Sequence, residues 1–100
     1  MLKFGEIINK EIPVLIDFYN QWNENSTPMS ETLRHVSAAL GDRAQVIKID
    51  VEKNIELAKA LKIKGLPTFI LYNHGKMIWR ESGEIDANTL INKVENLFNN

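Results

Sequence analysis

The sequence predicts an α/β fold in which a four-stranded mixed sheet is sandwiched by helices. Helical spacing and short apolar runs follow one another in the order α-β-α-β-α-β-β-α. The run Val14–Tyr19 is apolar on both faces except at Asp17, which is typical of a central strand covered by helices on both sides. His74-Gly75 separates the last two runs as in a tight hairpin. The 100 residues suit a single domain, 1–100.

In the first half of the chain, apolar residues at helical spacing predict a short helix over Lys3–Asn9, and Val14–Tyr19 follows as the first strand. Residues 20–26 are polar apart from Trp22 and are expected to form a loop. Thr27 or Ser26 is the expected N-cap of a second helix. One face of that helix carries Met29, Leu33, Val36 and Leu40, and it ends at Gly41-Asp42.

The second half predicts a strand over Ala44–Val51, a helix from Ile55 to near Ile63, and a hairpin. The hairpin strands are Phe69–Tyr72 and Lys76–Ser82. Asp86 is the expected N-cap of the last helix, whose apolar stripe contains Leu90, Ile91, Val94, Leu97 and Phe98. Strands separated by helices are expected to pair in parallel, and the hairpin strands antiparallel.

Composition excludes several classes of function. The formal net charge of −1 offers no basic field for nucleic acid or an anionic membrane, and no apolar run approaches the roughly 20 residues that span a bilayer. The first residues lack the pattern of a signal peptide, so we expect a cytoplasmic protein. The sequence contains no cysteine, and no metal-ligand spacing or phosphate-binding glycine loop stands out, so we expect no cofactor and no metal.

Several landmarks together resemble the thioredoxin family. They begin with the strand residues Asp17-Phe18-Tyr19 and the following Trp22, and their spacing is similar across nearly the whole chain. The later landmarks are Ile49-Asp50, Gly65-Leu66-Pro67-Thr68, the turn at Gly75 and the glycine Gly83. The resemblance implies a thioredoxin-like fold.

The loop that follows Trp22 departs from the family's pattern. Family members carry Trp-Cys-x-x-Cys at the start of a helix, but here the two cysteine positions fall on Asn23 and Ser26, with Glu24 and Asn25 between them. Neither an amide nor an unactivated hydroxyl can perform thiol–disulfide exchange, which requires a sulfur nucleophile. We therefore expect no catalytic residue of the family's kind in this loop.

Ser26 has two interpretations. It caps the helix, or it holds an anion or a thiol such as glutathione at the helix N-terminus. His35 lies two turns along the helix and His74 lies at the hairpin tip, so neither is placed to act as a base for Ser26.

Asp17 is a carboxylate within an apolar strand. If it is buried, desolvation is expected to raise its pKa, and the side chain must be hydrogen-bonded, paired or protonated. Lys48 is a candidate partner. The resemblance implies that the matching aspartate accepts a proton near the second cysteine, but this chain has no thiol for it to serve. A structural role for Asp17 therefore stands beside the functional one.

The resemblance also implies that the Leu66-Pro67 bond is cis and faces the active loop. The residue before such a proline offers its backbone N–H and C=O to an extended peptide. Trp22, Leu66, Pro67 and Thr68 would then form a shallow peptide-binding groove that needs no cysteine. The alternative is that this loop is retained for architecture alone.

These observations favour a redox-inactive thioredoxin-fold protein that binds an unknown protein or peptide partner, with no nucleic acid and no membrane. Two alternatives stay open. One is a family member assigned to disulfide reduction and cell redox homeostasis by homology. The other is a glutathione-binding, transferase-like enzyme that uses Ser26.

Overall fold

The computed structural model describes residues 3–21 and 27–99, and the side chains in the second range from residue 30 onward. It confirms the predicted four-stranded mixed sheet. The strands lie in the order β2-β1-β3-β4 and are β1 (Val14–Tyr19), β2 (Gln45–Asp50), β3 (Thr68–Asn73) and β4 (Lys76–Ser82). His74 and Gly75 form the predicted hairpin turn between β3 and β4, with φ of 54° and 81°.

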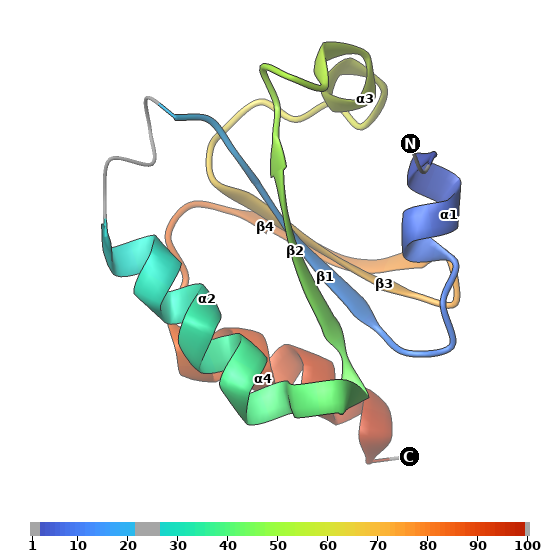
Figure 1. Ribbon diagram of the computed structural model, residues 1–100, viewed down its shortest axis with the longest axis vertical. Helices are drawn as coiled ribbons and strands as arrows, with labels where there is room; N and C mark the ends of the chain where they lie inside the picture. The colour runs from blue at the N-terminus through green and yellow to red at the C-terminus, as the bar shows by residue number, and fades with distance from the viewer. Residues whose placement is uncertain (1–2, 22–26, 100) are drawn as a thin grey trace.

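The pairing of the strands was predicted correctly in two cases and wrongly in one. β1 pairs with β2 in parallel and β3 pairs with β4 antiparallel, but β1 and β3 are also antiparallel. The physical reason is the short helix α3 (Ile55–Ala60), whose six residues span only about 9 Å. It stays at the end of the sheet where β2 finishes, so β3 starts from that end and runs back (Figure 1).

The helices form a layer on each face of the sheet (Figure 1). α2 (Thr27–Leu40) and α4 (Ala87–Glu95) pack side by side on one face, and α1 (Phe4–Ile8) and α3 lie on the other. The short 3₁₀ segments η1 (Gly41–Arg43) and η2 (Asn96–Phe98) follow α2 and α4. Gly41 has a φ of +56°, the conformation expected of the residue after a helix end. No helix in the described residues is long and apolar enough to cross a membrane.

The sheet separates two apolar clusters, because successive side chains of a strand point to opposite faces. The cluster under α2 and α4 is the larger one. Its buried members are Leu15, Leu33, Val36, Leu40, Ala44, Phe69, Leu71, Ile85, Leu90 and Val94. The cluster under α1 and α3 contains the buried residues Val14, Ile16, Phe18, Ile49, Ile70 and Tyr72.

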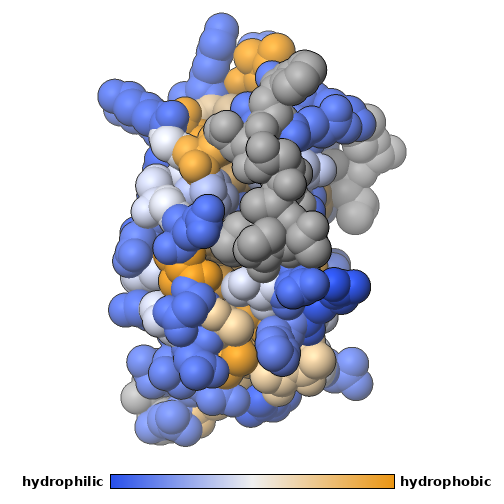
Figure 2. Space-filling model, turned by 90° about the vertical axis from the view of Figure 1, so that its left-hand side faces the viewer, coloured by the Kyte–Doolittle hydropathy of each residue, from blue (hydrophilic) through white to orange (hydrophobic). Residues whose placement is uncertain are grey.

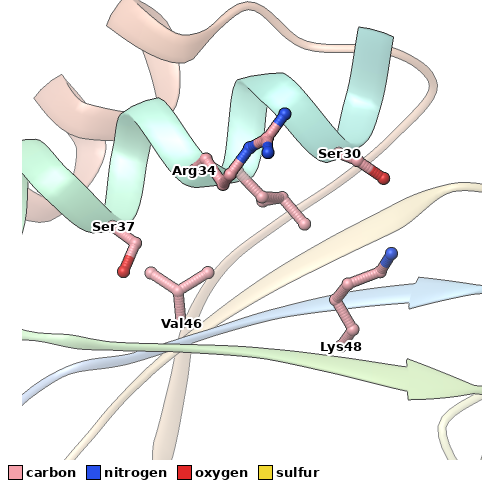
Figure 3. Close-up of a pocket in the computed structure, with 6 residues that line it drawn as sticks. Ser30, Arg34, Ser37, Val46 and Lys48 are labelled. Carbon is pink, nitrogen blue, oxygen red and sulfur yellow. The ribbon is translucent and has the colours of Figure 1, made fainter. Parts of the chain in front are cut away.

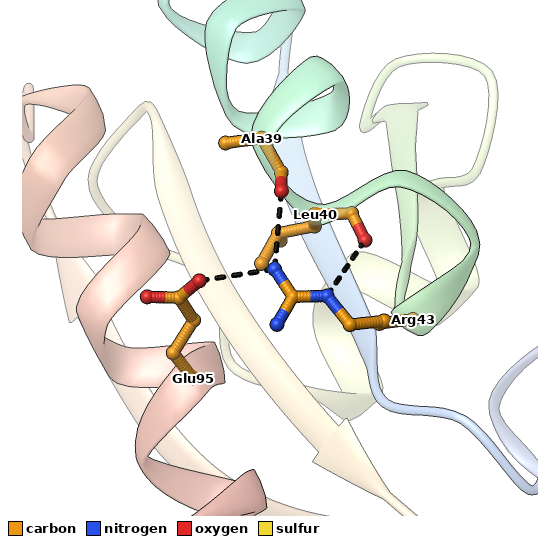
Figure 4. A network of polar contacts seen from close by, with 4 residues as sticks. All are labelled: Ala39, Leu40, Arg43 and Glu95. Atoms are coloured by element: carbon orange, nitrogen blue, oxygen red, sulfur yellow. Dashed lines mark hydrogen bonds and ion pairs between the residues drawn. The ribbon is translucent and has the colours of Figure 1, made fainter.

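Arg43 joins the C-terminal end of α2 to α4 (Figure 4). Its guanidinium donates to the backbone oxygens of Ala39 and Leu40 at 3.1 and 3.3 Å, and to the Glu95 carboxylate at 3.0 Å. These carbonyls end the helix without an intrahelical partner, and a cation is favourable there. The contact therefore links the C-terminal end of α2 to α4 at the surface, where both charged side chains are exposed.

Asp86 immediately precedes α4, as predicted. Its Oδ1 accepts a hydrogen bond from the Thr89 hydroxyl at 2.6 Å. This bond stabilises the charged form and holds the pKa of Asp86 below its ordinary value.

Candidate functional site: the Leu66–Pro67 loop

The site begins where α3 ends. The helix was expected to continue to near Ile63, but it ends at Ala60 because Lys62 adopts the left-handed conformation, with φ of 56°. The Ile63 N–H bonds to Ala58 O at 2.9 Å and the Lys62 N–H bonds to Lys59 O at 3.0 Å. These two bonds form the Schellman motif, which closes a helix and turns the chain sharply away from its axis.

Arg80 of β4 holds this turn in place. Its two terminal nitrogens donate to the backbone oxygens of Leu61 and of Lys62, the second at 2.8 Å. A guanidinium can satisfy two carbonyls at once because its donors form a planar fork. Nothing in the sequence pattern identified Arg80, since a charged residue on an edge strand is ordinary.

The peptide bond between Leu66 and Pro67 is cis. The carbonyl oxygen of Pro67 accepts a hydrogen bond from the N–H of Gly83 at 2.8 Å. Gly83 lies just beyond β4 with a φ of +101°, a conformation that L side chains rarely adopt. The landmarks Pro67 and Gly83 are therefore joined directly, although they are sixteen positions apart in the sequence.

Thr68 holds the loop in place through its hydroxyl group. It is fully buried, and its hydroxyl is hydrogen-bonded to the Gly65 carbonyl and to the Ser82 hydroxyl, the second at 2.8 Å. A Cβ added to Gly65 would meet the Ser82 side chain at an ordinary contact distance of 3.6 Å. The Thr68 hydroxyl is thus used inside the protein, and its role at the site is to position the loop.

Leu66 differs from its neighbours. Neither its backbone N–H nor its C=O makes a hydrogen bond within the part of the chain that the structure describes. Its side chain is half-buried and packs against the cluster under α1 and α3. The loop therefore holds Leu66 through its neighbours, and among the described residues one donor and one acceptor of its backbone have no partner.

A hollow of about 360 Å³ adjoins Leu66. Apolar side chains and three exposed lysines line it: Val51, Ile55, Ala58, Lys59, Lys62, Ile63, Lys64 and Leu66. Ile55 is 56% exposed, which makes it the most exposed large hydrophobic residue described. The hollow can take an apolar side chain, and the ammonium groups around it favour acidic neighbours.

Asp17 is buried, 1% exposed, in the central strand β1. The register places it opposite Lys48 of β2, on the face that α2 and α4 cover. The Lys48 ammonium lies 4.6 Å from the centroid of the Tyr19 ring. The candidate pair of Asp17 and Lys48 is therefore brought onto neighbouring strands, and the burial on which the Asp17 hypothesis depended is present.

The other predicted site residues lie outside the described residues. They are Trp22, Asn23, Glu24, Asn25 and Ser26, the last of which is also one of the two expected N-caps. The structure thus brings together Leu66, Pro67 and Thr68, and the question of a Ser26 site remains a prediction from the sequence.

The surface around α2 is mostly hydrophilic. Figure 2 shows that side, where apolar areas are small and separated by hydrophilic side chains outside the part that grey atoms cover. In the described residues, no group of three or more His, Asp or Glu side chains is placed to hold a metal ion. Near Leu66, a ligand could contact a backbone donor and acceptor, an apolar hollow and lysine side chains.

Comparison with known proteins agrees with this geometry. A family model described as thioredoxin matches residues 2–96. Thioredoxin Y, chloroplastic, from Oryza sativa subsp. japonica is 44% identical over 93 residues, which are 92% of this chain and 55% of that protein. The thioredoxin-like protein slr0233 from Synechocystis sp. is 35% identical and covers 83% of this chain and 79% of its own length.

The solved structures give the same result. Chloroplastic thioredoxin z superposes with a TM-score of 0.83 at 26% identity, covering 95% of this chain and 88% of the other. Thioredoxin-2, described as a component of malaria parasite protein secretion machinery, superposes with a TM-score of 0.81 at 28% identity, covering 87% and 84%. The chain spans about half the length of the plant relatives it matches, between 52% and 55%.

Proposed function

Because this chain belongs to the thioredoxin family, we propose that it binds an extended segment of a partner protein along the Leu66–Pro67 loop, without thiol–disulfide exchange. The backbone of Leu66 carries the proposal. Its N–H and C=O make no hydrogen bond within the described residues, whereas Pro67 O and the Thr68 hydroxyl are both bonded. A peptide that forms both hydrogen bonds with Leu66 would lie beside it as an added strand, a binding mode called strand addition.

The neighbouring hollow gives the partner's chemistry. An extended peptide that bonds to Leu66 would place a side chain beside the apolar lining around Ile55 and Ile63. Lys59, Lys62 and Lys64 surround that position, so an apolar residue flanked by acidic ones is the preferred sequence. We expect modest affinity, because the small hollow allows little burial.

The absence of cysteine supports the redox part of the proposal. The chain contains no sulfur nucleophile to attack a disulfide. An insulin-reduction assay with dithiothreitol is expected to give the rate of the dithiothreitol control. Catalysis above that control by the pure protein would overturn this part of the proposal and favour a disulfide reductase.

The binding part is tested by NMR with a blocked octapeptide of alternating Glu and Val, in which apolar residues are flanked by acidic ones. The amide signals of Leu66 and Gly83 are expected to move on titration, and so is the Trp22 indole. The variant Leu66→Pro lacks the backbone donor and is expected to bind about tenfold more weakly, the worth of one good hydrogen bond. The matched control Leu66→Ala keeps the donor and is expected to stay within about threefold.

Equal binding by the two folded variants would overturn the strand-addition mode. If Leu66→Pro does not fold, the wild-type Leu66 amide decides, because a new hydrogen bond moves its proton signal downfield and lowers its temperature coefficient. An unmoved Leu66 amide at saturation would place the peptide elsewhere.

The cytoplasm remains our proposed compartment for this protein. The plant relatives are named as chloroplastic. A fluorescent fusion of the full-length protein tests the compartment.

A further inference from the structure

The hollow beside Leu66 is bounded in large part by a segment without regular structure. Eight described residues line this hollow, and half of them lie between the end of α3 and the start of β3: Lys62, Ile63, Lys64 and Leu66. The rest of the lining comes from α3 and from the residue that follows β2. An irregular segment lacks the hydrogen-bond pattern of a helix or strand, so this wall of the hollow keeps its shape only where other contacts fix it.

A second hollow, of about 380 Å³, provides a contrast (Figure 3). It lies between α2 and β2, with Arg34 and Ser37 on the helix and Val46 on the strand. Its walls belong to a helix of fourteen residues and to a strand paired continuously with β1, so their own hydrogen bonds place them. Ser30 and Lys48, which also line it, already interact with other residues of the chain. Of the two hollows, the one beside Leu66 is therefore the one whose shape depends on a separate contact.

Arg80 supplies that contact. It lies on β4 opposite Ile70, whose side chain is buried on the face that α1 and α3 cover. From this position the guanidinium donates to the backbone oxygens of Leu61 and Lys62, the first two residues after α3. Because the donors of a guanidinium form a rigid fork, the two bonds together fix the orientation of this stretch as well as its distance from the sheet.

The other described contacts of this stretch hold it less firmly to the sheet. α3 contains no buried residue, and Leu61 and Ile63 are only partly buried against the cluster beneath them. The Schellman bonds from the N–H groups of Lys62 and Ile63 run back to α3, so they shape the turn without attaching it to a strand. Arg80 therefore connects the irregular wall of the hollow to a strand that is paired within the sheet.

We propose that Arg80 is a positioning residue for partner binding, which acts through Leu61 and Lys62 and gives the hollow its selectivity for an apolar side chain. The inference rests on the binding proposed at the Leu66–Pro67 loop. Arg80 is not among the described residues that line the hollow, so it acts without touching a side chain held there. A wall that is already ordered loses little conformational entropy when a partner binds, whereas a wall freed from Arg80 must be ordered at that moment.

NMR titration of the full chain with two blocked octapeptides tests the proposal. One alternates Glu and Val, and the other alternates Glu and Ala. The wild type is expected to bind the Val peptide at least about fivefold more tightly, because valine buries more apolar surface in the hollow. The methyl signals of Ile55 and Ile63, which line the hollow, are expected to move more with the Val peptide, and the Leu66 amide is expected to move with both peptides.

Arg80→Lys retains the positive charge, but a single ammonium group cannot span the two carbonyls. We expect this variant to bind the Val peptide about tenfold more weakly, because the wall must now be ordered on binding. Its preference for the Val peptide over the Ala peptide is expected to fall to about twofold or less. This ratio separates positioning from a purely structural role, since a partly unfolded population would weaken the binding of both peptides equally.

Leu90→Ala is the matched control, because it removes a fully buried side chain beneath α4 and destabilises the fold far from the hollow. The three proteins are titrated at a temperature at which all are folded, and Leu90→Ala is expected to keep the affinities and the preference of the wild type. If Arg80→Lys does not fold, Arg80→Met replaces it, since methionine keeps an unbranched apolar stem and removes both donors. Lys76→Met, which removes the same charge elsewhere on β4, is then the control.

The titrations separate the role of Arg80 from the proposed function. An unmoved Leu66 amide in the saturated wild type would overturn the proposed function, and the role of Arg80 with it. Binding at Leu66 with unchanged affinities in Arg80→Lys would overturn the role of Arg80 alone. An equal loss for both peptides, or the same loss from Leu90→Ala, would show that Arg80 supports the fold as a whole and does not position the hollow. A loss of the Val preference in Arg80→Lys alone supports the proposal.

Discussion

The two faces of the sheet are closed by very different layers. α2 and α4 contain fourteen and nine residues, and α4 buries Leu90 and Val94 completely. α1 and α3 contain only five and six residues, and neither helix contributes a buried residue. One face is therefore covered by long amphipathic helices, and the other by two single turns whose apolar side chains remain partly exposed.

The difference separates stability from binding. We call the face under α2 and α4 the thick face and the face under α1 and α3 the thin face. The Leu66–Pro67 loop and the apolar hollow beside it belong to the thin face, where Leu57, Leu61 and Ile63 are only partly buried. Local opening costs least where few apolar groups are buried. We infer that the thick face holds the fold, while the thin face can adjust to a partner at little cost in global stability.

The largest expected effect compares the same substitution on the two faces. Leu90→Ala, beneath α4, is expected to lower the free energy of unfolding by about 3 kcal/mol, because a fully buried leucine loses its transfer energy and leaves a cavity. Leu57→Ala, on α3, is expected to cost only about 1 kcal/mol, because the side chain is only partly buried. Urea unfolding of both variants measures the difference.

Equal losses from the two leucine variants would contradict the division between a thick and a thin face. Hydrogen exchange sharpens the test. In the wild type, amides of α3 should exchange faster than those of α4, since α3 is expected to open without global unfolding.

The next effect concerns the link between the thin face and the sheet. Arg80→Lys keeps the charge but cannot donate to Leu61 O and Lys62 O together. We expect a loss of about 2 kcal/mol, the range for hydrogen bonds from a charged group. Hydrogen exchange of the variant should rise in residues 61–66 and remain unchanged in α4. An unchanged free energy of unfolding would show that the turn is held by its own backbone.

Much of the fold could be predicted because its signals are local and periodic. Val14–Tyr19 is apolar on both faces, and Leu33, Val36 and Leu40 repeat at helical spacing, so the order of the helices and strands and the four-stranded sheet were predicted correctly. The last helix was expected to include Leu97 and Phe98, but α4 ends at Glu95 and these two residues belong to η2. The antiparallel pairing of β1 with β3 was missed, because it depends on where α3 lies in space and not on any repeat along the chain.

The site was predicted only in part. Pro67 and Thr68 were found through the resemblance, and the direct bond from the Gly83 N–H to Pro67 O explains why these landmarks lie together. Arg80 and Lys62 were missed. A hydrogen bond between residues eighteen positions apart leaves no periodic trace, and a lysine in the left-handed conformation contradicts the usual preference for glycine.

Lys62 itself gives a smaller prediction. Lys62→Gly is expected to raise the free energy of unfolding by about 1 kcal/mol, because glycine adopts the positive φ of 56° without the steric cost of a Cβ. Lys59→Gly, inside α3, is the matched control and is expected to lower it by about 1 kcal/mol. Thermal unfolding shows whether the two changes in stability have opposite signs. A loss of stability in both variants would mean that the Lys62 side chain stabilises the turn.

Tyr72 lies on the thin face and gives a prediction about how stability depends on pH. Its ring meets that of Phe4 edge-on at 5.5 Å, and its buried hydroxyl makes no hydrogen bond within the described residues. Burial raises the pKa of Tyr72, an effect that the charge of Arg80 partly offsets. Because the unfolded chain ionises first, the fold loses stability as the pH rises from 10 through the folded pKa of Tyr72, and below pH 10 this titration changes nothing.

Tyr72→Phe removes that titration and the buried hydroxyl together. At pH 8 we expect the variant to be as stable as the wild type or more stable by up to about 1 kcal/mol, since no hydrogen bond is lost and less polar surface is buried. Above pH 10 the advantage of the variant should widen, because only the wild type is drawn toward the ionised unfolded state. Urea unfolding of both proteins at pH 8, 10 and 11 measures this; an advantage that narrows with rising pH would mean that the thin face lets water reach the hydroxyl.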